Sequence, residues 1–124
     1  MVNHIRKLGV VATFFTLLLI TQQAQAHAHL KTAIPADKSE VIASPKQLTL
    51  KFTEDLEASF SGVELKDPKG VTVPTGKATL DASDKSSLIV PLDKALDAGK
   101  YQVDWHALSV DGHKTKGEYT FTVK

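Results

Sequence analysis

Apolar and polar residues alternate with a period of two in several short segments, and this feature most restricts the fold of the 124-residue chain. A period of two places successive side chains on opposite faces of a β-strand, so one face of each segment can be buried. Turn-forming residues separate the segments, at 67–70, 98–100 and 111–112. Short alternating strands joined by turns predict an all-β sandwich. The predicted strands lie at residues 47–53, 63–65, 87–91, 101–105 and 119–123.

A tyrosine corner is predicted where the strand at 101–105 begins. Gly99 precedes Tyr101, which opens a strand whose alternation places Trp105 in the core. In immunoglobulin-like Greek-key sandwiches, a tyrosine in this position donates its hydroxyl to the connecting loop. The predicted fold is therefore an immunoglobulin-like Greek-key β-sandwich. Helix is expected only as one short turn, at 39–44 or 93–96, and residues 67–87 are expected to be the most loop-like part.

The first 26 residues have the pattern of a secretory signal peptide. Arg6 and Lys7 form a positively charged start, residues 8–20 are an uncharged and mostly apolar run, and residues 24–26 are Ala-Gln-Ala. The run is shorter than the roughly 20 apolar residues of a bilayer-spanning helix. The sequence therefore predicts a cleaved signal peptide at residues 1–26 and an exported domain at residues 27–124.

The composition of the exported part excludes several kinds of function. Without Arg6 and Lys7, 13 basic residues stand against 14 acidic ones, a formal charge of −1. No basic surplus remains to neutralise phosphates, which argues against a nucleic-acid partner. The chain has no cysteine, so it has no thiol nucleophile, disulfide or thiolate metal site.

Cleavage after Ala26 would make His27 the first residue of the exported protein. The free α-amine and the ring Nδ1 of one histidine can then chelate a metal ion together, which an internal histidine cannot do. Both nitrogens bind metals in their deprotonated forms, with ordinary pKa values of about 8 and about 6.5.

Asp111 and His113 form a second pair of candidate ligands. Gly112 between them favours a turn that leaves both side chains able to converge. Asp-Gly-His alone also occurs in ordinary solvated turns, so it gains meaning from the histidine at position 27. The combined nitrogen and oxygen donors suit a tetragonal Cu(II) ion better than Ni(II) or Zn(II).

Several motifs together resemble the CopC-type family of bacterial periplasmic copper-resistance and copper-trafficking proteins, and within it the short YobA-like branch. The resemblance extends over essentially all of residues 27–124. The motifs are His27-Ala28-His29-Leu30, Pro35-Ala36-Asp37, Leu50-Lys51-Phe52-Thr53-Glu54, Phe60-Ser61-Gly62, the segment 99–105 and the segment 109–117.

The resemblance implies an immunoglobulin-like sandwich that binds Cu(II) through an N-terminal histidine, an aspartate and a second histidine. These positions are His27, Asp111 and His113 in this chain. Glu54 stands where the family has an acidic residue near the metal, and an ordinary exposed carboxylate is the alternative. Some members bind Cu(I) through a methionine-rich loop, but the single methionine here is Met1, so no Cu(I) methionine site is expected.

Two further histidines have open roles. His29 is the third residue of the predicted exported protein. Residues 27–29 could therefore bind copper instead, through the α-amine, two deprotonated amides and the His29 ring. Otherwise His29 is an exposed strand residue or a replacement ligand at low pH. His106 follows the core residue Trp105 and is expected to point outward near Asp111. It could hydrogen-bond a copper ligand there, or be an ordinary surface histidine.

The favoured hypothesis is a periplasmic, monomeric, non-enzymatic Cu(II)-binding protein that buffers copper or delivers it to a membrane transporter resembling CopD. One alternative is an oxidative copper enzyme with an N-terminal histidine. Such an enzyme needs an open coordination position, which Asp111 would occupy. The other alternative is an immunoglobulin-like interaction module that binds no metal.

Overall fold

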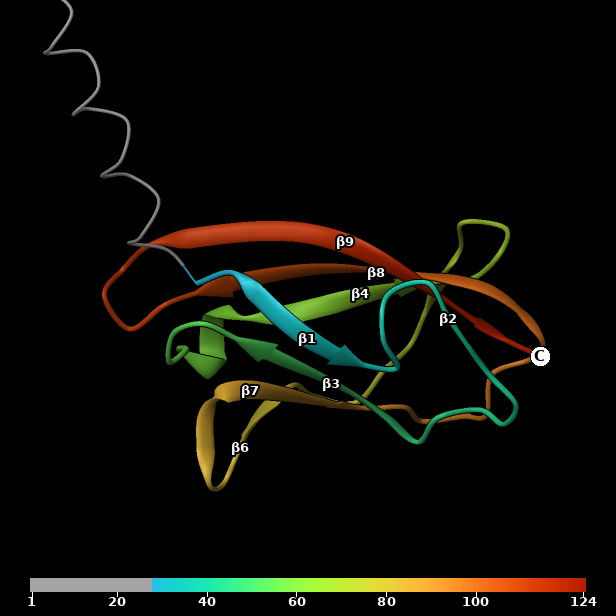
Figure 1. The fold of residues 1–124 in the computed structure, drawn as a ribbon, viewed down its shortest axis with the longest axis horizontal. Coiled ribbons are helices and arrows are strands. Elements are labelled where there is room, and N and C mark those ends of the chain that lie inside the picture. The colour runs from blue at the N-terminus through green and yellow to red at the C-terminus, as the bar shows by residue number, and fades with distance from the viewer. Residues whose placement is uncertain (1–27) are drawn as a thin grey trace, which may run out of the picture.

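The computed structural model describes residues 28–124, which form two β-sheets packed face to face (Figure 1). One sheet has four strands in the order β1-β3-β7-β6, and the other has five in the order β2-β9-β8-β4-β5. All neighbouring strands are antiparallel except β2 and β9, which are parallel. The predicted β-sandwich is confirmed.

In the part of the chain that the structure describes, one short 3-10 turn, η3, lies between β3 and β4. Within residues 28–124, no helix is long and apolar enough to cross a bilayer. The bounds are β1 Leu30–Ile34, β2 Ser39–Val41, β3 Gln47–Phe52, η3 Ala58–Phe60, β4 Gly62–Lys66, β5 Thr72–Val73, β6 Thr79–Asp81, β7 Asp84–Pro91, β8 Gly99–Leu108 and β9 Lys114–Val123.

The core lies between the sheets and follows the predicted alternation. Leu48, Leu50 and Phe52 of β3 are buried, while the residues between them are half-buried. The Phe52 ring meets the Trp105 indole edge to face, with 5.1 Å between ring centroids. Because the period of a strand is two, each sheet contributes one apolar face to this core.

The tyrosine corner is also confirmed. The Tyr101 hydroxyl donates a 2.9 Å hydrogen bond to the Asp97 carbonyl in the loop before β8. The ring of Tyr101 is buried and stacks on Phe121 of β9, at 5.8 Å between centroids. This contact fixes the direction in which the chain enters β8.

The expectation of one short helical turn at 39–44 or 93–96 was wrong. Ser39–Val41 is a strand, because it pairs in parallel with Phe121–Val123 of β9, and residues 93–96 contain no helix. The one short helical turn, η3, lies elsewhere. The segment 67–87 contains β5, β6 and the start of β7, since pairing with β4 and with the rest of β7 orders a sequence that has few apolar residues.

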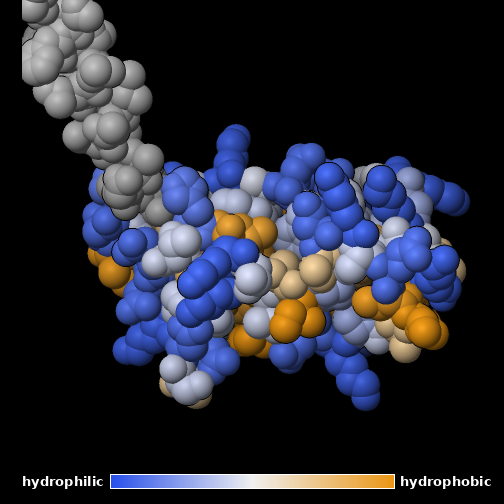
Figure 2. All heavy atoms as spheres, viewed as in Figure 1, coloured by the Kyte–Doolittle hydropathy of each residue, from blue (hydrophilic) through white to orange (hydrophobic). Residues whose placement is uncertain are grey.

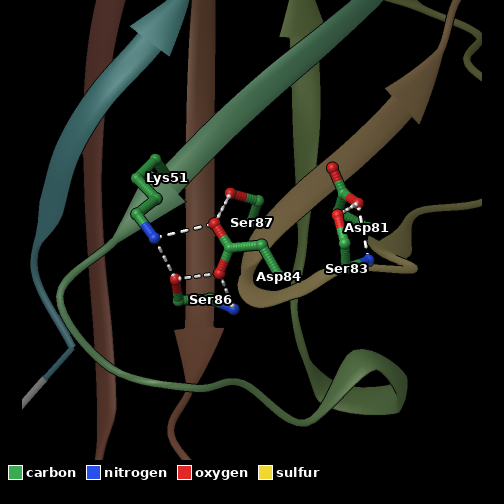
Figure 3. A network of polar contacts seen from close by, with 6 residues as sticks. All are labelled: Lys51, Asp81, Ser83, Asp84, Ser86 and Ser87. Carbon is green, nitrogen blue, oxygen red and sulfur yellow. Dashed lines mark hydrogen bonds and ion pairs between the residues drawn. The ribbon is translucent and has the colours of Figure 1, made fainter.

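One end of the sandwich gathers the start of β1, the β6–β7 hairpin and the β8–β9 turn (Figure 1). A polar network ties β3 to β7 at this end (Figure 3). The Lys51 ammonium lies 2.7 Å from the Asp84 carboxylate and 2.6 Å from the Ser86 hydroxyl, and the Ser87 hydroxyl also donates to Asp84. These bonds hold the pKa of Asp84 far below its ordinary value, with the bond from Lys51 contributing most.

Most of the face drawn in Figure 2 is hydrophilic, and its apolar patches are small and separated. Five large apolar residues of the described chain are nevertheless exposed: Ile34, Ile42, Phe60, Val71 and Val110.

Candidate metal centre

The β8–β9 turn is built by Ser109 and Gly112. Gly112 has a backbone φ of 92°, a left-handed conformation that glycine adopts without steric cost. Its amide donates to the Ser109 carbonyl at 2.9 Å, and the Ser109 amide donates to the His113 carbonyl at 3.0 Å. These bonds close a tight turn that brings residues 111 and 113 to the same side.

The turn places Asp111 and His113 in contact, as predicted. Asp111 Oδ1 lies 3.1 Å from His113 Nδ1, and both side chains are about half exposed. The buried hydroxyl of Ser109 donates a short hydrogen bond to the same carboxylate oxygen. The Ser109 bond, followed by the contact with His113, holds the pKa of Asp111 below its ordinary value. The carboxylate is therefore ionised, which is the form in which it can bind a metal ion.

The start of the described chain is fastened beside this turn. Ala28 is completely buried in the core, and its carbonyl accepts a 2.7 Å hydrogen bond from the Thr115 hydroxyl near the start of β9. The loop after β3 joins the same assembly, because the Asp55 carbonyl accepts a 3.0 Å bond from the Val110 amide. Three distant parts of the chain thus meet at one end of the sandwich.

His27, the predicted N-terminal ligand, lies outside the described residues. Within residues 28–124, no group of three or more histidine, aspartate or glutamate side chains could hold a metal ion. Of the three proposed ligands, the described part of the chain contains Asp111 and His113, which lie in contact with each other.

His29 is exposed, and its backbone is engaged with the loop after β3. The His29 amide donates to the Thr53 hydroxyl at 2.9 Å, and the His29 carbonyl accepts from the Thr53 amide at 2.9 Å. Glu54 follows Thr53 and is half-buried. In the described structure the hydrogen-bond partners of the Asp111 carboxylate are Ser109 and His113, so Glu54 does not bond it.

His106 points outward from β8, as the alternation with buried Trp105 predicted. It stands between Gly62 of β4 and Lys116 of β9. Its imidazole lies over Gly62, where a Cβ atom would come within 3.2 Å of the ring. The described hydrogen-bond partners of the Asp111 carboxylate are Ser109 and His113, so His106 does not bond this ligand. A hydrogen bond from His106 to another copper ligand stays a prediction.

The sequence reasoning did not identify the hydroxyls of Ser109, Thr115 and Thr53. Ser109 continues the inward positions of β8 after Trp105 and Ala107, and it is fully buried. A serine predicted at a buried position must find a hydrogen-bond partner, which could have indicated its bond to Asp111. The partners of Thr115 and Thr53 are 87 and 24 residues away, and no local pattern indicates them.

Known proteins resemble this chain over most of its length. Residues 30–124 match the CopC domain. The protein YobA of Escherichia coli K12 is 44% identical over 124 residues, which span both chains completely. Copper resistance protein C of Escherichia coli is 38% identical over 107 residues, covering 82% of this chain and 84% of the relative.

Solved structures confirm the fold. The crystal structure of CopC from Methylosinus trichosporium OB3b superposes with a TM-score of 0.74 at 35% identity, covering 79% of this chain and 94% of that one. The structure of PcoC, a methionine-rich copper resistance protein from Escherichia coli, gives a TM-score of 0.71 at 39% identity, covering 80% and 100%.

Proposed function

Because the chain belongs to the CopC family, whose relatives support a copper-related function, we propose that it is an exported Cu(II)-binding protein. In this proposal residues 1–26 are removed, and the protein buffers copper in the periplasm or delivers it to a membrane transporter. The proposed ligands are the amine and ring of His27, the carboxylate of Asp111 and the imidazole of His113.

The observation that carries the proposal is the contact between Asp111 and His113 beside the anchored start of the domain. Their ligand atoms are 3.1 Å apart, so they can bind one ion with little rearrangement. Ala28, the chain neighbour of His27, is held at Thr115, two residues beyond His113. The residue next to the proposed N-terminal ligand is thus held beside the turn.

The donor set also suits the oxidised metal. Amine, imidazole and carboxylate donors favour Cu(II), which heads the affinity order of the divalent metals for such sites. The methionine-rich relative PcoC has soft sulfur donors, whereas the only sulfur in this chain is that of Met1. The proposed cargo is therefore Cu(II) rather than Cu(I).

Capture and release follow from protonation. The carboxylate of Asp111 is already ionised, so binding requires only that the amine and the imidazoles lose their protons. Acidification returns protons to these nitrogens and releases copper. No step requires a change in the oxidation state of the metal, in keeping with a binding protein rather than an enzyme.

The alternative in which residues 27–29 wrap copper is disfavoured by the backbone. That arrangement needs the deprotonated amide nitrogen of His29, but this amide donates to the Thr53 hydroxyl. It also needs the amide of Ala28, a residue that is completely buried. Forming it would break a hydrogen bond and expose core surface, costs that a site at Asp111 and His113 avoids.

The test combines the mass of the exported protein with Cu(II) titrations. Trp105, the only tryptophan, provides a fluorescence signal, and electron paramagnetic resonance reports the donor atoms. We expect a mass beginning at His27. We also expect at least a roughly 100-fold loss of affinity in His113→Ala and in a variant with one glycine before His27, since losing even a residue that orients a ligand costs about 10–100-fold.

His106→Ala is the matched control and should bind copper as the parent does. His29→Ala separates the two ligand sets, because only the tripeptide arrangement uses the His29 ring. Tight Cu(II) binding that survives both His113→Ala and the added glycine would refute the proposed ligands.

A further inference from the structure

A basic and partly apolar face lies beside the candidate metal centre. We define the basic–apolar face by Phe60, His106, Val110, Lys114 and Lys116. His106 and Lys116 are cross-strand neighbours on β8 and β9, and Lys114 begins β9 directly after His113. Val110 directly precedes Asp111, so the face adjoins both described candidate ligands.

Two large apolar side chains of this face are exposed to solvent. Phe60 is 63% exposed and Val110 is 57% exposed. Phe60, His106 and Lys114 line a groove of about 320 Å³ between η3 and the start of β9. The groove has a firm base, because the Phe60 amide donates to the Glu57 carbonyl and the Glu57 amide donates to the Leu108 carbonyl. Exposed aromatic residues on a firm support are typical of the centre of a protein interface.

The two lysines of this face differ from Lys51 of β3 and Lys66 of β4. Lys51 and Lys66 each pair with a carboxylate, at 2.7 Å to Asp84 and 3.2 Å to Asp104. Neither Lys114 nor Lys116 takes part in an ion pair with any residue in 28–124. The face is therefore locally positive on a domain whose residues 27–124 carry a formal charge of −1.

We propose that the basic–apolar face docks the protein that exchanges copper with this one, and that this partner presents carboxylates around an apolar side chain. This inference rests on the proposed function. Transfer by ligand exchange requires the partner's ligands to reach a copper ion still held at Asp111 and His113, so the docking surface must border the turn. Complementary charge speeds the encounter and sets its orientation, while Phe60 supplies apolar contact.

Photo-crosslinking in the native host tests this interface. Benzoylphenylalanine replaces Phe60 in the full chain, or Val110 as a second position, and replaces exposed Val71 of the loop before β5 as the control. Crosslinked peptides are sequenced on both sides by mass spectrometry. Each variant is first titrated with Cu(II), so that a loss of copper binding, which would count against the proposed function, is separated from a loss of docking.

We expect a crosslink from position 60 to a different protein, at a segment that contains aspartate or glutamate, and none from position 71. Lys116→Glu should reduce the crosslink at least about fivefold, since like charges across an interface are strongly unfavourable. Lys100→Glu, at the opposite end of β8, should leave it unchanged. The expected result requires all of these observations together.

Several outcomes would overturn the proposal while copper binding persists. These are no crosslink from either position 60 or position 110, a crosslink that Lys116→Glu and Lys100→Glu weaken equally, and a crosslink to a second copy of the same chain. Binding of the protein to phosphatidylglycerol vesicles that is abolished by Lys116→Glu, without any protein crosslink, would instead assign the face to a membrane surface.

Discussion

Two buried tyrosines differ in whether the hydroxyl has a partner, and this difference predicts opposite effects of the same substitution. The Tyr101 hydroxyl donates to the Asp97 carbonyl at 2.9 Å. The buried Tyr119 hydroxyl has no hydrogen-bond partner within the described residues. Burial raises the pKa of both phenols, and that of Tyr119 is raised further. Changing each tyrosine to phenylalanine removes one oxygen and keeps the ring.

Tyr101→Phe should lower the free energy of unfolding by about 0.5–1.5 kcal/mol, the net contribution of one hydrogen bond. The stack on Phe121 is retained, so ring packing adds little to the loss. A change of 1 kcal/mol shifts the melting temperature of a domain this size by about 4–8 °C, which gives a fall of roughly 2–12 °C. Tyr119→Phe should leave stability unchanged or raise it by about 1 kcal/mol, because it removes an oxygen that is desolvated without a partner.

The assay is urea unfolding of the copper-free protein, followed by Trp105 fluorescence. Copper is removed with a chelator because a bound ligand shifts apparent stability. Equal denaturant slopes for the parent and both variants are required before midpoints are compared. The reasoning is refuted if Tyr119→Phe destabilises the protein as much as Tyr101→Phe does.

Two further predictions concern packing and acid stability. Gly117→Ala should destabilise the fold by about 1–3 kcal/mol, because its Cβ would lie 2.6 Å from the Trp105 indole. Urea unfolding measures this, with Glu118→Ala on the exposed face as the control, and a neutral Gly117→Ala would contradict the packing. The depressed pKa of Asp84 means that its carboxylate stabilises the fold above its unfolded pKa, about 3.9, and that this stabilisation is lost as pH falls below it. The Asp84→Asn variant should therefore have a lower free energy of unfolding than the parent at neutral pH. Between about pH 4 and pH 2.5 it should lose less stability than the parent. Parallel profiles of unfolding free energy against pH would show that the network with Lys51 contributes nothing.

The long strands were predictable because alternation repeats enough times to identify their place in the chain and their buried face. This holds for β3, β8 and β9, where residues such as Leu50, Val103 and Phe121 are fully buried. The predicted strands at 101–105 and 119–123 were nevertheless too short, since β8 extends over Gly99–Leu108 and β9 over Lys114–Val123. Strands β1, β2, β5 and β6 were missed. The last three have only two or three residues, which give no usable period, and β1 has a register shift between Leu30 and Thr32 that interrupts its alternation.

The candidate site shows the same division. Asp111 and His113 were predictable as a converging pair because one glycine separates them, and the turn is local. The support for the carboxylate was not, since it comes from the buried hydroxyl of Ser109. The role of His27 remains a prediction.

By itself the sequence determined which residues alternate, where the chain turns, which side chains could bind a metal and that no cysteine or second methionine competes with them. Only the tertiary structure decided that Ala28 lies against Thr115, that Thr53 engages the His29 backbone and that Phe60 and Lys114 share one groove. The physical reason is the range of the interactions. Alternation and turns act between neighbours along the chain, whereas these contacts arise when two separately formed sheets pack and bring distant strand ends to one edge of the sandwich.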